Sequence, residues 1–364
     1  MEKRTMDKLG IDVSLLGFGC MRFPTTPDGK IDEPRAEALL DRAIAEGVNY
    51  IDTAYPYHNG ESEPFVGKVL SKYDRDSFFL ASKLPLWAVE TLDDAKRIFA
   101  EQLERLRTDH IDFYLLHAVN KEKWDKMKEL GVVDYCAQLK AEGKIRYYGF
   151  SFHDSYEVFE EILRYRDWDF CQIQYNYMDT QEQAGDRGYA LAEELGVPLV
   201  IMEPVKGGSL ANASIASWAL RWVGSHSNVK VILSGMSTEG QVEDNLHTFN
   251  SFAPLDEKEQ AVIAEIVKEL KSRVQNGCTG CRYCMPCPVG IDIPKNFALW
   301  NKYHIYGTYD HVKNAWENEL KEGEKAQNCV HCGRCEGLCP QKLSIRADLE
   351  RVYEDMKRAQ ENGD

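Results

Sequence analysis

Two hydrophobic patterns alternate along this chain between residues 15 and 235. Short apolar runs are followed by segments with apolar residues at intervals of three and four. This unit of one run and one segment recurs about every thirty residues. The short runs predict buried strands, and the longer segments predict amphipathic helices such as Asp32 to Glu46 and Thr91 to Arg107. Eight strands are predicted: LLGFGC from 15, NYIDTA from 49, FFLASK from 78, IDFYLLH from 111, IRYYGFS from 145, FCQIQYN from 170, PLVIMEP from 198 and VKVILSG from 229.

Eight strand-helix units of this length predict an α/β fold that closes into a (β/α)8 or TIM barrel of about 250 residues. An open doubly wound sheet is the alternative, but the first strand lacks the G-x-G-x-x-G turn that leads into a helix in such folds. A further helix is predicted from Leu255 to Val274, and Gln275-Asn276-Gly277 ends it. We therefore expect a barrel over residues 1–275 and a second, mainly helical domain over residues 276–364.

Composition excludes some classes of partner. The chain has 364 residues, of which 43% are hydrophobic, and this is ample for a buried core. Its net charge is -15 and no basic face is evident, which argues against nucleic acid and anionic membranes as partners. We find no apolar signal segment and no membrane-spanning run of about eighteen apolar residues. We expect a cytoplasmic protein, and nothing in the pattern specifies an oligomeric state.

Three successive predicted strands each end on an ionisable residue. Asp52 ends the second strand, and Tyr57 follows it five residues later. Lys83 ends the third strand and His117 ends the fourth. One such residue at a strand end is more often a solvated rim residue than a catalytic group. Because the carboxyl ends of barrel strands form the catalytic face, the four side chains together predict an active site.

This combination resembles the aldo-keto reductase superfamily, whose members carry Asp and Tyr five residues apart, then Lys in an S-K-x pattern and His after a D-x-Y-L-L-H strand. The similarity extends from Leu15 to about Asn245. It implies an enzyme that interconverts a carbonyl and an alcohol. Tyr57 would be the proton donor, and the ammonium of Lys83 would favour its phenolate. Asp52 would hold Lys83, and His117 would orient the substrate oxygen.

The resemblance also implies contacts to a nicotinamide dinucleotide. Ser151 and Gln172 match positions that hold the nicotinamide carboxamide, although Phe152 stands where the family usually has Asn. Met202 replaces an aromatic residue that stacks on the nicotinamide in relatives. The phosphates would meet the ammonium of Lys206 and the backbone amides of Gly207 and Gly208. A simple flexible turn is the alternative for these two glycines.

Two further groups of residues complete the predicted cofactor site. Arg22, next to Met21 after the first strand, would anchor a phosphate or an acidic substrate, and a rim salt bridge is the alternative. NADP-preferring relatives carry cations after the eighth strand. The candidate contacts there are instead Ser234, Gly235, Met236, Gln241 and Asn245. This favours NAD(H) over NADP(H), and a flavin is an alternative cofactor.

Eight of the eleven cysteines form two short runs near the C-terminus. Each run has cysteines at three-residue steps and ends in Cys-Pro, as in bacterial ferredoxins with two 4Fe-4S clusters, although the first run is one residue shorter at its end. Zinc is the alternative. Crossed ligation, as in two-cluster ferredoxins, predicts one cluster on Cys278, Cys281, Cys284 and Cys339 and the other on Cys329, Cys332, Cys335 and Cys287.

The remaining residues of this region and the last three cysteines have simpler interpretations. Helical spacing between the two runs, from Ile293 to Tyr303 and from His311 to Leu320, resembles helical ferredoxin domains. Cys20, Cys136 and Cys171 are expected to be small core residues of the barrel.

These patterns lead to one main hypothesis and three alternatives. The main hypothesis is an oxidoreductase acting on a small-molecule carbonyl or alcohol, with electrons relayed through the clusters to or from a redox partner such as ferredoxin. A flavin-dependent iron-sulfur oxidoreductase on the same barrel is the first alternative. An electron-transfer or scaffold protein with a non-catalytic barrel is the second. In the third, the clusters only stabilise a small domain.

Overall fold

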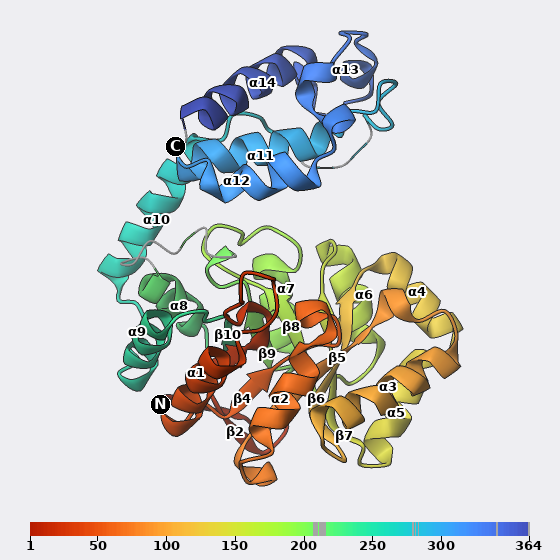
Figure 1. The fold of residues 1–364 in the computed structure, drawn as a ribbon, viewed down its shortest axis with the longest axis vertical. Helices are drawn as coiled ribbons and strands as arrows, with labels where there is room; N and C mark the ends of the chain where they lie inside the picture. Colours follow the sequence, from red (N-terminus) through yellow and green to blue (C-terminus); the bar gives the residue numbers. More distant parts are fainter. Residues whose placement is uncertain are drawn as a thin grey trace. The chain divides into compact units, whose positions relative to one another are not determined.

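The computed structural model describes residues 1–206, 210, 216–278, 280, 282, 284–339 and 341–362. The chain divides into two compact units, Met1–Asp256 and Glu257–Asp364. The first unit contains the strands, and the second consists of helices and loops in its described residues (Figure 1).

The first unit is a closed barrel of eight parallel strands. Each strand pairs with its neighbours in chain order, and β10 closes on β3 through pairs such as Ile232 with Leu16. The eight predicted strands and the predicted barrel are therefore confirmed. The strands are β3 (Leu16–Gly19), β4 (Tyr50–Asp52), β5 (Phe79–Pro85), β6 (Ile111–Val119), β7 (Ile145–Phe152), β8 (Phe170–Gln174), β9 (Leu199–Met202) and β10 (Val229–Ser234).

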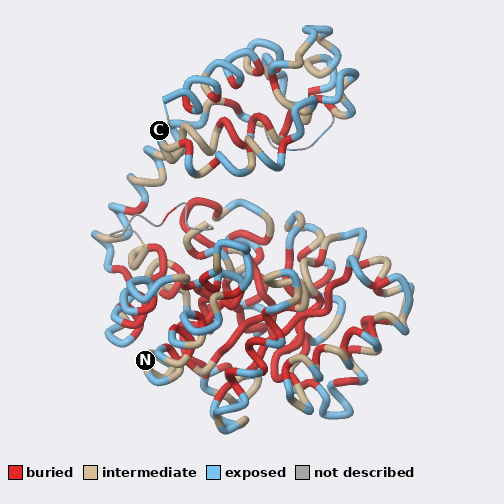
Figure 2. Tube along the Cα trace, viewed as in Figure 1, coloured by how far each residue is buried: buried red, intermediate tan, exposed pale blue. Residues whose placement is uncertain are grey.

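Helices surround the barrel and pack their apolar faces on the strands, so burial is concentrated at the centre of this unit (Figure 2). The ends of α3 show why the sequence signals were accurate. The Thr91 hydroxyl accepts the N–H of Asp94, whose carboxylate accepts the N–H of Thr91, and Arg107 ends the helix in the left-handed conformation. The helices are α1 (Glu33–Ala45), α2 (Ser62–Leu70), α3 (Leu92–Leu106), α4 (Lys121–Glu129), α5 (Val132–Ala141), α6 (Tyr156–Tyr165), α7 (Gly185–Glu194), α8 (Ala216–Gly224) and α9 (Glu239–Asn250).

A two-stranded hairpin, β1 (Lys3–Met6) and β2 (Ile11–Ser14), closes one end of the barrel and was not predicted. Met6 and Val13 are fully buried among interior side chains from the strands, including Tyr50 and Phe170. Tyr50 and Phe170 are the first residues of their strands, so the hairpin covers the amino ends of the strands. The predicted catalytic face lies at the opposite end.

The second unit has its own apolar core between helices. The core includes Phe297 and Trp300 of α11 and Val352 and Met356 of α14. The two predicted helices between the cysteine runs are present, although the second continues beyond α12 as a wider turn over Ala315–Glu319. The long helix α14 was not predicted. The helices are α10 (Glu257–Ser272), α11 (Ile293–Tyr306), α12 (Asp310–Asn314), α13 (Arg334–Leu338) and α14 (Ile345–Asn362).

Helix α10 lies between the predicted domain boundary and the observed division of the chain. The sequence placed this helix at the end of the barrel domain, whereas the division after Asp256 places it in the second unit. Ile263 is its one buried residue among the described residues, so the helix is weakly packed. A domain boundary at 275 stays a prediction. None of the helices in the described ranges combines the length and apolar character that crossing a membrane requires.

Candidate functional site

The carboxyl ends of β4 and β5 bring three of the four predicted catalytic residues together. Lys83 is fully buried, and its Nζ donates to Asp52 Oδ1 at 2.7 Å and to the Thr53 carbonyl at 2.8 Å. The same Nζ lies 3.4 Å from the Tyr57 hydroxyl. Burial alone would lower the pKa of Lys83, but Asp52 and Tyr57 outweigh burial and raise it. Lys83 is therefore a buried cation held against a phenol.

His117 joins this group through an irregularity in β6. Pairing between β6 and β7 shifts register between Leu116 and Val119, and Ala118 has φ 53°. The Ser151 hydroxyl accepts the Ala118 N–H at 2.8 Å, which stabilises this bulge. The His117 ring centre lies 6.0 Å from that of Tyr57. Burial, together with the charge of Lys83, lowers the pKa of His117 well below its usual value, so the imidazole is neutral at neutral pH.

The ionisation of Tyr57 differs from the expectation. From the sequence, Lys83 was expected to favour the phenolate. Burial raises the pKa of the Tyr57 hydroxyl, however, and Lys83 offsets only part of this effect. Tyr57 therefore holds its proton at rest. A proton donor needs this state, and Lys83 remains close enough to stabilise a phenolate that forms during reaction.

The turn after Tyr57 has an unusual backbone. His58, Asn59 and Gly60 have φ values of 51°, 55° and 88°, a left-handed region that is uncommon for residues other than glycine, although His and Asn enter it more often than most. The His58 ring packs 5.8 Å from that of Phe23, and its Nε2 is buried without a hydrogen-bond partner among the described residues. Contacts of the side chains thus hold a strained turn beside the phenol.

A buried polar network behind Lys83 was also missed from the sequence. Glu63 Oε1 accepts hydrogen bonds from the Ser82 hydroxyl and from Gln102 Nε2, both at 2.6 Å. Gln102 Nε2 also donates to the Lys83 carbonyl at 3.1 Å, which ties α2 and α3 to the end of β5. Burial raises the pKa of Glu63. Ser82 immediately precedes Lys83, and this neighbouring hydroxyl on the strand was the signal available in the sequence.

The predicted carboxamide contacts lie side by side. Ser151 of β7 pairs in register with Gln172 of β8, and both are buried. Gln172 Nε2 donates to Met202 Sδ at 3.4 Å, whereas its Oε1 is buried without a partner among the described residues. Lys206 forms an ion pair with Asp179. Gly207 and Gly208 lie outside the described residues.

At the end of β10, the structure brings Arg22 against Gly235. A Cβ at position 235 would lie 2.6 Å from Arg22 Cγ, so only glycine fits beneath this side chain. Arg22 is exposed and forms no ion pair among the described residues, and Met21 beside it is 55% exposed. The remaining candidates interact with one another or with the core: Asn245 donates to Ser234 Oγ at 2.8 Å, Gln241 accepts the Ser237 N–H at 2.7 Å, and Met236 is buried in the barrel core.

Two residues near His117 were not predicted. Trp87 follows β5 and its ring centre lies 5.0 Å from that of His117. Lys123 of α4 places Nζ 5.5 Å from the centre of the Trp87 ring. Trp87 comes four residues after Lys83 at the same strand end, and this position was the available signal. The lysine-rich sequence of α4 contains no comparable signal for Lys123.

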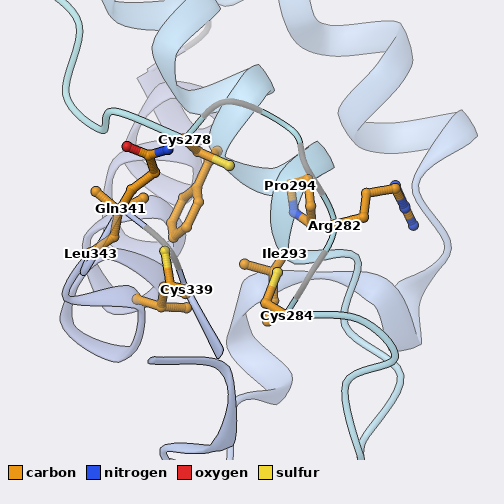
Figure 3. Close-up of a pocket in the computed structure, with 10 residues that line it drawn as sticks. Cys278, Arg282, Cys284, Ile293, Pro294, Cys339, Gln341 and Leu343 are labelled. Carbon is orange, nitrogen blue, oxygen red and sulfur yellow. The ribbon is translucent and has the colours of Figure 1, made fainter. Parts of the chain in front are cut away.

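In the second unit, the cysteines line two cavities. The first is lined by Cys278, Cys284 and Cys339, whose sulfur atoms face one space (Figure 3). The second is lined by Cys287, Cys329, Cys332 and Cys335. Ile293 lines both cavities. Cys281 lies outside the described residues.

The three cysteines outside the two runs are all buried. Cys20, Cys136 and Cys171 lie in the barrel core, which confirms the expectation for them.

Solved structures and curated proteins similar to this chain agree with this architecture. A structure of the aldo-keto reductase AKR11C1 from Bacillus halodurans (holo form) superposes with a TM-score of 0.63 at 28% identity, covering 73% of this chain and 96% of that one. The Bacillus subtilis protein named uncharacterized oxidoreductase YqkF is 31% identical over 223 residues, covering 58% of this chain and 67% of the relative. The NADH-specific methylglyoxal reductase of Escherichia coli is 24% identical over 315 residues, covering 69% of this chain and 94% of the relative.

Family models match both parts of the sequence. The model described as Aldo/keto reductase family matches residues 15–214 and 211–268. The model described as a 4Fe-4S dicluster domain matches residues 277–344, which contain all eight cysteines of the two runs. The chain therefore belongs to the aldo/keto reductase family, as an oxidoreductase that carries a C-terminal 4Fe-4S dicluster domain.

Proposed function

We propose that the barrel reduces a small-molecule carbonyl to an alcohol, or catalyses the reverse reaction, with Asp52, Tyr57, Lys83 and His117 as its catalytic residues. The observation that carries this proposal is the fully buried Lys83 ammonium, held by Asp52 and placed 3.4 Å from the Tyr57 hydroxyl. A buried cation against a phenol is costly to maintain and suits a site where negative charge develops on the phenol oxygen.

Each of the four residues has a separate role in the reaction. Tyr57, protonated at rest, donates its proton to the carbonyl oxygen. Lys83 then stabilises the phenolate, and Asp52 keeps the Lys83 ammonium in place. Neutral His117 donates a hydrogen bond to the substrate oxygen and orients it. A bound nicotinamide supplies the hydride.

The residues at the ends of β7 and β8 fit a nicotinamide carboxamide. Gln172 Oε1 is a buried acceptor without a partner among the described residues, and a carboxamide N–H would satisfy it. The Ser151 oxygen already accepts one N–H, so its hydroxyl proton is available to a carboxamide oxygen. This complementarity favours nicotinamide over flavin in our proposal.

In the second unit we propose two 4Fe-4S clusters with crossed ligands. Cys278, Cys281, Cys284 and Cys339 would hold one cluster, and Cys287, Cys329, Cys332 and Cys335 would hold the other. Thiolates are the usual ligands of such clusters, which exchange single electrons. Ile293 lines both cavities, so the two groups of cysteines adjoin the same side chain. This proximity supports a relay of single electrons between the two clusters and a redox partner such as ferredoxin. Each hydride delivered in the barrel would require two such transfers and one proton.

The test of the barrel's function is turnover by the full chain purified without oxygen. NADH and a panel of simple aldehydes should give stoichiometric NAD⁺ and alcohol. A protein that retains its iron but oxidises no NADH with any aldehyde, and reduces no NAD⁺ with the matching alcohols, would contradict the proposal.

The pH dependence should reflect the neutral state of His117. Since burial lowers the pKa of His117 well below its usual value of about 6.5, the imidazole does not change charge between about pH 6 and pH 8. We expect kcat/KM to be level across this range. A steep fall as the pH drops through about 6.5, in a step limited by chemistry, would show that His117 titrates normally.

NADH should bind more tightly than NADPH. Without a cation at Gly235, Met236 or Gln241, the extra phosphate of NADPH has to lose water without a partner. The Escherichia coli relative is named as an NADH-specific reductase, which supports the same preference. Titrations that follow protein fluorescence measure both affinities, and tighter binding of NADPH would refute the prediction.

Arg22 provides the control for this prediction, since its side chain packs against Gly235 and carries a positive charge. If Arg22 contacts the pyrophosphate, Arg22→Gln weakens both dinucleotides by the same factor. A loss confined to NADPH would instead assign Arg22 to the 2'-phosphate.

A further inference from the structure

Trp87 and Lys123 adjoin the proposed catalytic residues, yet the reaction described above does not use them. The Trp87 ring is 49% exposed and lies 5.0 Å from the His117 ring. Lys123 Nζ lies 5.5 Å from the centre of the Trp87 ring and donates to the Ala118 carbonyl at 2.9 Å. Tyr57, His117, Trp87 and Lys123 therefore follow one another along the catalytic face.

Lys123 differs from the other lysines of its own helix. Lys121 pairs with Glu161 at 2.8 Å, Lys126 pairs with Glu90 at 2.8 Å, and Lys128 pairs with Asp125 at 3.0 Å. Lys123 is the lysine of α4 without an acidic partner among the described residues. An ammonium has three N–H groups, and the Ala118 carbonyl uses one of them.

The position of Lys123 makes a cation without an acidic partner unfavourable for the fold. Its backbone N–H donates to Asn120, which caps the start of α4, so Lys123 lies in the first turn, where the helix dipole already carries positive charge. The side chain is also partly buried, and burial lowers the pKa of Lys123. An anion at this position would relieve both effects.

We propose that Trp87 and Lys123 bind the far end of the substrate, and that this end carries an anionic oxygen group, a carboxylate or a phosphate ester. The inference rests on the proposed function, because the carbonyl end is taken to lie at Tyr57 and His117. A planar substrate body stacks on the exposed face of Trp87. Its anionic end takes the free N–H groups of Lys123.

The test compares aldehydes that differ only at the far end of a ring. Benzaldehyde is the neutral reference, 4-carboxybenzaldehyde carries a carboxylate, and 4-formylphenyl phosphate carries a phosphate ester. We expect kcat/KM to be about tenfold higher for at least one anionic aldehyde than for benzaldehyde, and the better of the two identifies the group. In Lys123→Met the ratio of kcat/KM for the anionic aldehyde to that for benzaldehyde should fall to about one. Lys123→Arg should retain most of the preference, and Lys126→Met should leave it unchanged.

Three results would overturn the proposal. The first is a wild-type protein that shows no preference for either anion. The second is a preference that survives in Lys123→Met. The third is a Lys123→Met variant in which all aldehydes slow by the same factor, because Lys123 would then only brace Trp87.

Direct binding separates this proposal from the proposed function. Titration calorimetry with 4-carboxybenzyl alcohol and with benzyl alcohol needs no turnover. Stronger binding of the carboxylate, lost in Lys123→Met, would support the anion site even if no aldehyde were reduced. Equal binding of the two alcohols would overturn the carboxylate form of the site, and 4-(hydroxymethyl)phenyl phosphate tests the phosphate form in the same way.

Discussion

Tyr57→Phe should reduce kcat for carbonyl reduction by about 10²- to 10⁴-fold while leaving the barrel folded. The substitution removes one hydroxyl, which is the proposed proton donor and lies 3.4 Å from the Lys83 ammonium. The ring remains, so its packing beside His117 is preserved. The measurement is single-turnover NADH oxidation with a saturating aldehyde, which isolates the chemical step from product release.

Tyr55→Phe is a matched control for this variant. Tyr55 lies two residues earlier in the same turn, and its hydroxyl donates to Glu101 at 2.8 Å, a residue of α3. Its loss should change turnover little. If Tyr57→Phe keeps near wild-type turnover, another group donates the proton. If Tyr55→Phe is equally slow, the effect arises from the turn and the assignment of the acid has no support.

The sequence predicted the barrel well because its signals are local and repeated. Apolar runs such as IDFYLLH mark the strands, and caps such as Thr91 mark the helix ends within one residue. Once the strands close a barrel in chain order, residues at their carboxyl ends share one face. The proximity of Lys83 to Asp52 and Tyr57 follows from that topology, and no long-range contact had to be guessed.

The features that the sequence did not predict depend on tertiary packing. The His58 ring, on a residue in the left-handed conformation, packs 5.8 Å from that of Phe23, 35 residues earlier in the chain, and no local pattern signals this contact. The raised pKa of Tyr57 comes from the depth of burial, which a pattern of residue types does not specify. That Lys123 has no acidic partner among the described residues shows only when the partners of the neighbouring lysines are known.

Cys332→Ala should remove about half of the bound iron and abolish carbonyl reduction driven by a reduced one-electron dye, while turnover with NADH continues. Cys332 is the exposed cysteine of the second cavity, so its loss disturbs packing little. If clusters in both cavities form one relay, loss of either breaks it. The loss of a cluster is measured by iron analysis and electron paramagnetic resonance. The loss of the relay is measured by the reduction rates with the dye and with NADH. Cys171→Ala in the barrel core controls for the loss of a thiol.

The contrasting view is that the clusters only stabilise the second unit, and the structure gives a physical reason to expect otherwise. Buried side chains such as Phe297, Trp300 and Val352 already form an apolar core between α11 and α14. With that core in place, the second unit should keep its helices when one cluster is lost, so the Cys332→Ala variant separates the two roles. Circular dichroism measures the helix content of the variant, and iron analysis measures the clusters that remain. Together they distinguish a structural role from a relay. Loss of helix together with both clusters would assign the clusters a structural role, and a folded variant that still reduces substrate at the full rate from the dye would exclude the relay.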